Sequence, residues 1–221
     1  MTTHDLPSSL TAVRRSILTM GAAVEAHVEE CMGIFLRGDT DAAKEAISRD
    51  RIIDQMDLRV EAECVQILAR FAPVARDLRF VLAVLRIEND LERISDLAKG
   101  VAKRTLHDDE QIPMEKPAAL SLMIDHALQM LSDALRSLAD NNAELARKVR
   151  ASDQLVDDLQ RAIYDWATTE IPEHVEMTSS AINILSVTRA VERIADLATN
   201  IGEDVVFMTE GSVVRHSNVG R

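Results

Sequence analysis

The sequence predicts an all-α fold built as two tandem, pseudo-symmetric three-helix bundles with six long helices. Three observations support this prediction. The 221 residues include only seven Gly and five Pro, too few turn residues for a many-stranded sandwich or barrel. Apolar residues recur at helical spacing over six stretches of roughly 25 to 35 residues. One of these stretches also recurs, in altered form, 100 residues later.

The expected helices are separated by residues that stop or start helices. The breaks are Gly38-Asp39, Ala72-Pro73, a loop from Asp108 to Pro117, Asn141-Asn142 and Ile171-Pro172. Gly38 suits the left-handed position after a helix. Asp39 or Thr40 can then cap the next helix with a side-chain oxygen.

An apolar stripe identifies the third segment as a helix. Its members recur at intervals of 4, 3, 4 and 3 residues and are Ile87, Leu91, Ile94, Ala98 and Val101. On a helix these residues lie within about 80° of one another, whereas a strand cannot use the pattern. The sixth segment carries the same stripe in Val187, Val191, Ile194, Ala198 and Ile201.

The repeat divides the chain into two units. Residues 85–98 read LRIENDLERISDLA and residues 185–198 read LSVTRAVERIADLA, with seven of fourteen positions identical. A duplicated three-helix unit explains this similarity. We expect the first unit at 8–107, the second at 117–210, and a flexible tail at 211–221.

Composition excludes several functions. With 37 acidic and 25 basic side chains, the net charge is -12, so we expect no nucleic-acid partner. No apolar run approaches the roughly 18 to 20 residues that span a bilayer, so we expect no direct membrane insertion. The first thirty residues do not resemble a secretion signal. Cys31 and Cys64 lie in apolar stretches, as buried thiols of a reducing compartment do, so the chain is predicted to be cytoplasmic.

Acidic residues form columns on four of the expected helices. The third helix carries Glu88, Glu92 and Asp96 at four-residue spacing, and the sixth carries Glu192, Asp196 and Asn200. Matching acids on the second and fifth helices are Asp50, Asp54, Asp57, Glu61, Asp153 and Asp157. Antiparallel packing around the Pro-containing turns brings these columns side by side. Counting from each Pro places the first pair of columns level and offsets the second pair by about one turn.

Clustered carboxylates of this kind are typical of a metal site. Like charges four residues apart disfavour a helix, and a second column adds repulsion that a multivalent cation would reverse. Carboxylate and amide ligands suit iron, manganese, magnesium or calcium, whereas zinc usually prefers some His or Cys. The competing interpretation is a solvated surface whose charge is offset by neighbours such as Arg93 and Arg193.

The same residues resemble the PhoU family of phosphate-signalling proteins. Asp77-Leu78-Arg79 followed by Leu91-Glu92-Arg93-Ile94-Ser95-Asp96 is similar to that family's first motif. The run from Arg189 through Val191-Glu192-Arg193-Ile194-Ala195-Asp196 to Asn200 resembles its second motif. The resemblance covers about residues 8 to 210.

The resemblance implies a non-enzymatic cytoplasmic negative regulator of phosphate uptake and phosphate-starvation signalling, and a homodimer. Its implied partners are the ATPase of a phosphate ABC transporter and a phosphate-responsive sensor histidine kinase. It also implies metal ligands, namely Asp50, Asp54, Glu92 and Asp96 in the first unit and Asp153, Asp157, Glu192, Asp196 and Asn200 in the second. The family often has Asn where this chain has Gly100, which weakens the first site or leaves room for water.

Two other functions stay open at this point. One is a metal-free structural scaffold with solvated acids. The other is a carboxylate-bridged di-metal enzyme. No Glu is followed three residues later by His, the pattern of ferritin-like di-iron bundles, which argues against the enzyme.

Overall fold

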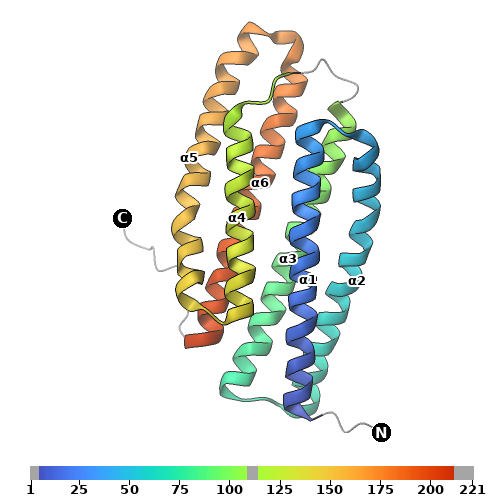
Figure 1. Cartoon of the computed structure of the whole chain (residues 1–221), viewed down its shortest axis with the longest axis vertical. Helices are drawn as coiled ribbons and strands as arrows, with labels where there is room; N and C mark the ends of the chain where they lie inside the picture. Colours follow the sequence, from blue (N-terminus) through green and yellow to red (C-terminus); the bar gives the residue numbers. More distant parts are fainter. Residues whose placement is uncertain (1–4, 109–113, 212–221) are drawn as a thin grey trace.

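The computed structural model describes residues 5–108 and 114–211 and confirms the predicted six-helix, all-α fold (Figure 1). Within these ranges the elements are α1 (Leu6–Arg37), α2 (Thr40–Phe71), α3 (Ala75–Asp108), α4 (Ala118–Asp140), α5 (Ala143–Glu173), the 3-10 turn η1 (Val175–Met177) and α6 (Thr178–Glu210). Apart from Gly211, the predicted flexible tail lies outside the described residues, so its flexibility stays a prediction.

The caps lie where the sequence predicts them. Gly38 is left-handed with φ 71°, and the side chain of Asp39 accepts a hydrogen bond from the N–H of Ala42 at 3.0 Å. In the second unit Asn141 is left-handed with φ 50°, and Asn142 caps α5. These side chains satisfy N–H groups that the first turn of a helix leaves without partners.

The predicted break at Ile171-Pro172 is wrong. Helix α5 continues through Pro172 to Glu173, and the chain turns at His174 and η1 before α6 begins. A Pro in the last turn of a helix removes only one backbone hydrogen bond, so the helix ends shortly after it. The true turn at His174 lies 17 residues after Asp157 and 18 residues before Glu192.

The two three-helix units pack side by side (Figure 1). Helix α3 contacts α1 and α2 in its own unit and α6 in the other, and α1 also contacts α4. Both predicted apolar stripes are buried, with every member at most 1% exposed. An ion pair from Arg86 to the buried carboxylate of Asp204 joins α3 to α6 at 3.2 Å. No helix in the described ranges is both long and apolar enough to cross a membrane.

Both cysteines are buried free thiols, as the sequence predicts. Burial raises the pKa of Cys31 and Cys64 to about 12, and neighbouring carboxylates add to the shift. A thiol with this pKa is not ionised at neutral pH, so neither side chain is prepared to bind a metal as thiolate.

The buried positions of the two units correspond through a shift in numbering that is constant along each pair of matching helices. Between α2 and α5 the shift is 103 residues, as shown by the buried pairs Ala43/Ala146, Ala46/Val149, Ile53/Val156 and Val60/Ile163. The same shift relates α1 to α4, whereas 100 residues relate α3 to α6. Within the paired helical stretches, a residue of one unit therefore has an identifiable counterpart in the other.

We expect Gly202→Ala to lower the free energy of unfolding by about 1–3 kcal/mol. A Cβ atom at Gly202 would lie 2.9 Å from the backbone oxygen of Ala146, so α5 and α6 would have to separate. Gly100 is the matched control, because nothing lies within 4 Å of its added Cβ. Gly100→Ala should stabilise the helix by about 0.5–1 kcal/mol. Urea titration of both variants measures the difference, and equal values would contradict this packing.

Candidate functional site

Helices α5 and α6 bring four carboxylates of the second unit together. Burial raises the pKa of Asp153, Glu192 and Asp196, and each is raised further by neighbouring acids that include Asp157. Arg193 offsets part of this effect on Glu192 and Asp196. The cluster therefore holds more negative charge than its surroundings neutralise.

These acids lie level with one another, although the sequence predicted an offset of about one turn. The charge of Asp157 raises the pKa of both Glu192 and Asp196, so its carboxylate lies near both. The prediction was wrong because it counted from Pro172. The turn at His174 is almost equidistant from the acids on its two sides.

The first unit gathers acids around Glu92 of α3. Burial raises the pKa of Glu92, and Asp96, Asp57 and Asp54 raise it further through their charges. Asp57 and Asp54 project from α2, so here too two antiparallel helices place carboxylates side by side. Asp54 and Asp96 are exposed at the outer edge of this group.

Glu88 is the most buried acid of the first group, with 6% of its surface exposed. Burial raises its pKa to about 8, and a hydrogen bond with Asp57 and the charges of Asp57, Glu61 and Glu92 contribute. The hydrogen bond between two carboxyl groups requires a shared proton. Glu88 is therefore held largely protonated at neutral pH when no cation is bound.

We expect the metal-free protein to lose stability as pH rises from about 4.5 to about 8. Over this range the unfolded chain releases the Glu88 proton while the folded protein retains it, so the unfolded state becomes favoured. Glu88→Gln should remove much of the decline. Thermal denaturation in chelator at several pH values measures it, with exposed Glu29→Gln as control. Parallel curves for all three proteins would contradict the assignment.

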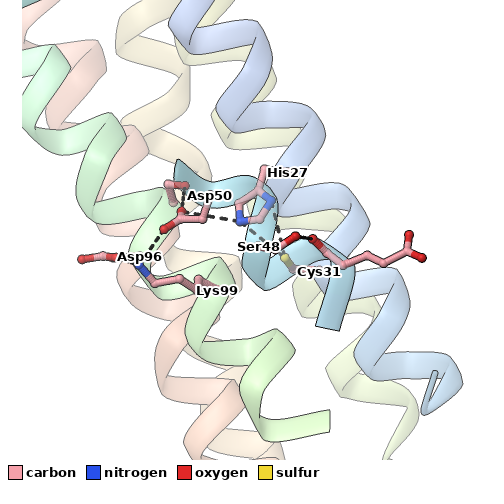
Figure 2. A network of polar contacts seen from close by, with 8 residues as sticks. His27, Cys31, Ser48, Asp50, Asp96 and Lys99 are labelled. Atoms are coloured by element: carbon pink, nitrogen blue, oxygen red, sulfur yellow. Dashed lines mark hydrogen bonds and ion pairs between the residues drawn. The ribbon is translucent and has the colours of Figure 1, made fainter. Parts of the chain in front are cut away.

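Asp50 is held by a lysine that it shares with Asp96 (Figure 2). Lys99 Nζ lies 2.6 Å from Asp50 Oδ2 and 2.5 Å from Asp96 Oδ1, and Ser95 donates to Asp50 Oδ1 at 2.6 Å. Burial raises the pKa of Asp50, but the hydrogen bonds from Lys99 and Ser95 outweigh it, and the pKa is lowered. Asp50 is thus an ionised partner of Lys99.

His27 lies on the other side of Asp50 (Figure 2), with Nε2 3.8 Å from Asp50 Oδ1. Burial lowers the pKa of His27, despite the opposing charges of Asp50 and Glu30. The thiol of Cys31 lies 3.7 Å from the same imidazole nitrogen. Neutral His27 therefore lies beside Asp50 without competing with Lys99 for the charge of the carboxylate.

Asn200 lines an open cleft of about 1010 Å³ between α2, α3 and α6. The sequence assigned Asn200 to the second group, but in this cleft it accompanies acids of the first, including Glu92 and Glu88. Arg86 and Arg93 line the same cleft. The second unit therefore contributes an amide to the surroundings of the first unit's acids.

Comparison with known proteins identifies the fold and the repeat. The model of the PhoU domain matches residues 17–105 and again residues 120–205, one match for each three-helix unit.

The chain belongs to the PhoU family.

Full-length relatives agree. A phosphate-specific transport system accessory protein PhoU homolog of Pseudomonas aeruginosa is 33% identical over 99% of this chain and 93% of its own. The phosphate-specific transport system accessory protein PhoU of Escherichia coli is 29% identical. The match covers 95% of this chain and 87% of that protein. The crystal structure of Pseudomonas aeruginosa PhoU has a TM-score of 0.90 at 31% identity, covering 94% of this chain and 100% of that one. The crystal structure of the phosphate transport system regulatory protein PhoU from Streptococcus pneumoniae has a TM-score of 0.86 at 26% sequence identity. The match covers 95% of this chain and 99% of that one.

The donor atoms of these acidic groups are of the kind that hard cations prefer, but they are not yet arranged around a common point. Their donors are carboxylates and one amide, which hard ions prefer. Among the residues described, no three His, Cys, Asp or Glu side chains already converge on one point. Holding an ion therefore requires new rotamers of partly exposed acids such as Asp157 and Glu192.

Motif transfer from the PhoU family selected Asp50 and passed over Glu88 and Asp57. Both stand in the acidic columns of the sequence, so the columns were the signal that identified them. Their role depends on the burial of Glu88 and on its hydrogen bond with Asp57, which the spacing does not show. No spacing in the sequence indicated that Lys99 pairs with Asp50, because the two residues lie on different helices.

Proposed function

We propose that this PhoU-family chain is a cytoplasmic accessory protein of a phosphate-specific transport system and a negative regulator of phosphate-starvation signalling. It acts as an adaptor between the transporter ATPase and a sensor histidine kinase, as a homodimer. Support comes from the relatives, which are named as accessory proteins of phosphate-specific transport over nearly the whole length of this chain. Regulation follows if the partners have different affinities for two states of the adaptor.

The proposed cation sites lie between paired helices. In the second unit Asp153, Asp157, Glu192 and Asp196 would hold the ion. In the first unit Asp54 and Glu92 would do so, with Glu88 and Asp57 beside them. The observation that carries this proposal is the gathering of four carboxylates between α5 and α6, where burial and neighbouring acids raise the pKa of Asp153, Glu192 and Asp196.

A bound cation would supply positive charge, and the protein would use it to fix a helix hairpin. Carboxylates from α5 and α6 repel one another while no cation lies between them. Binding turns that repulsion into attraction for both helices, so the hairpin becomes more rigid. A partner that docks on α5 and α6 would then meet a surface whose order depends on ion occupancy.

Elemental analysis of protein purified without chelator tests the metal component. We expect iron, manganese, magnesium, calcium or zinc to be retained, and the melting temperature to rise when the preferred ion is added to stripped protein. Absence of metal together with an unchanged melting temperature would leave the metal-free scaffold.

Deleting the gene and measuring alkaline phosphatase in phosphate-rich medium tests the regulatory component. We expect phosphatase to be produced despite sufficient phosphate, and complementation with the intact gene to restore repression. Unaltered repression in the deletion strain would contradict the regulatory role. Light scattering of the purified protein tests the homodimer.

A further inference from the structure

Lys99 occupies, in the first unit, the space between two carboxylates that come from different helices. Its ammonium group lies within hydrogen-bond distance of Asp50 on α2 and of Asp96 on α3. Burial lowers the pKa of Lys99, but the two carboxylates outweigh burial and raise it above the ordinary value. The lysine is therefore a fixed positive charge that bridges a helix pair.

The second unit carries the same two carboxylates without the lysine. Through the shifts of 103 and 100 residues, the corresponding pairs are Asp50/Asp153, Asp96/Asp196, Lys99/Thr199, Ser95/Ala195 and His27/Met130. The acids are kept, whereas the lysine, serine and histidine are replaced by side chains without positive charge. The buried Oγ1 of Thr199 has no hydrogen-bond partner within the described ranges.

Asp50 and Asp153 differ in charge compensation because only Asp50 has a lysine beside it. Asp50 is ionised and compensated, because Lys99 and Ser95 donate to it. Asp153 has no Lys, Arg or His partner among the described residues, and Thr199 stands at the position that Lys99 has in the first unit, so Asp153 is short of positive charge. A cation arriving at Asp153 would relieve repulsion, whereas at Asp50 it would first have to displace an ammonium group.

We propose that Lys99 is a built-in cation that takes the place of a metal ion in the first unit, so that the Asp153–Asp196 position binds a hard multivalent cation and the Asp50–Asp96 position does not. This inference rests on the proposed function, because it assumes that the second unit binds an ion. The Asp50–Asp96 position then stays neutralised at every ion concentration, whereas the Asp153–Asp196 position between α5 and α6 responds to the ion. Any ion in the first unit lies farther along, near Asp54 and Glu88.

Mn²⁺ titration of the stripped full-length protein, followed by calorimetry and by melting temperature, tests the proposal. We expect Asp153→Asn to weaken Mn²⁺ binding about 10- to 100-fold, whereas the matched Asp50→Asn leaves the affinity and the number of bound ions unchanged. Thr199→Lys, which copies Lys99 into the second unit, should weaken binding to a similar extent and remove the rise in melting temperature.

The reciprocal variant Lys99→Thr should create a Mn²⁺ requirement in the first unit, seen as an additional rise in melting temperature that Asp50→Asn cancels. If Lys99→Thr does not fold, Thr199→Lys and the two Asn variants still decide the matter. Loss of a bound ion in Asp50→Asn, or unchanged Mn²⁺ binding in Thr199→Lys, would overturn the proposed role of Lys99 but not the proposed metal function. A wild-type protein that binds no ion would overturn the proposed metal function, and the inference with it.

Discussion

Arg86→Met should lower the free energy of unfolding by about 2–4 kcal/mol, which is large for a residue whose side chain is 42% exposed. The reason is its partner. Asp204 is 1% exposed, and its carboxylate lies 3.2 Å from Arg86 Nη1 across the junction of the two units. Removing the guanidinium takes the positive charge of Arg86 away from that buried carboxylate. The guanidinium also lies over the ring of Phe207, 5.1 Å from the centroid, so the variant loses this contact as well.

Urea denaturation compared with a surface pair makes this test specific. Arg59 pairs with Glu63 along one helix face, and the Arg59 side chain is 68% exposed. Arg59→Met should change the free energy of unfolding by no more than about 1 kcal/mol, since exposed ion pairs contribute little. Asp204→Asn together with Arg86→Met should recover part of the loss, because no buried charge remains. A loss for Arg86→Met no greater than that for Arg59→Met would contradict the role of this ion pair.

Neutralising two acids of the second unit should change stability in opposite directions with and without a cation. In chelator, Asp157→Asn with Asp196→Asn should melt at a higher temperature than the wild type, because the repulsion that raises the pKa of Glu192 and Asp196 is reduced. With Mn²⁺ at 100 times its dissociation constant, the wild type should gain about 2.7 kcal/mol. The double variant should gain little.

A pair of acids away from the cluster provides the control. Asp125 on α4 and Asp165 on α5 are exposed, and their double Asn variant removes the same charge. This control should respond to Mn²⁺ as the wild type does. If the cluster variant also keeps the full Mn²⁺ response, its carboxylates are not the ligands. If it melts lower in chelator, the acids of α5 and α6 stabilise the metal-free protein through other contacts.

Most of the fold could be predicted because the signals that determine it are local. Burial of Ile87, Leu91 and Ile94 follows from helical spacing, and the turn at Gly38-Asp39 follows from conformational preference and capping. The position of Pro172 misled the prediction because a Pro near a helix end is compatible with one more residue of helix. That shift of the turn also explains why the acids of the second unit lie level.

The candidate site was less predictable because it depends on contacts between helices. Spacing identified the four acids that gather in the second unit, since each pair lies on one face of its own helix. Spacing did not show that Lys99 reaches back to Asp50, 49 residues earlier in the chain. Nor did it show that Glu88 is buried against Asp57. Both facts depend on the register of α2 against α3, which only the folded structure provides.

Anomalous diffraction from crystals of the stripped protein soaked in Mn²⁺ tests most directly whether acids of adjacent helices share an ion. We expect a peak between α5 and α6, with oxygens of Asp157 and Glu192 at about 2.0–2.6 Å from it, and none between Asp50 and Asp96. Manganese density confined to lattice contacts, with the α5 and α6 carboxylates still apart, would contradict the shared ion.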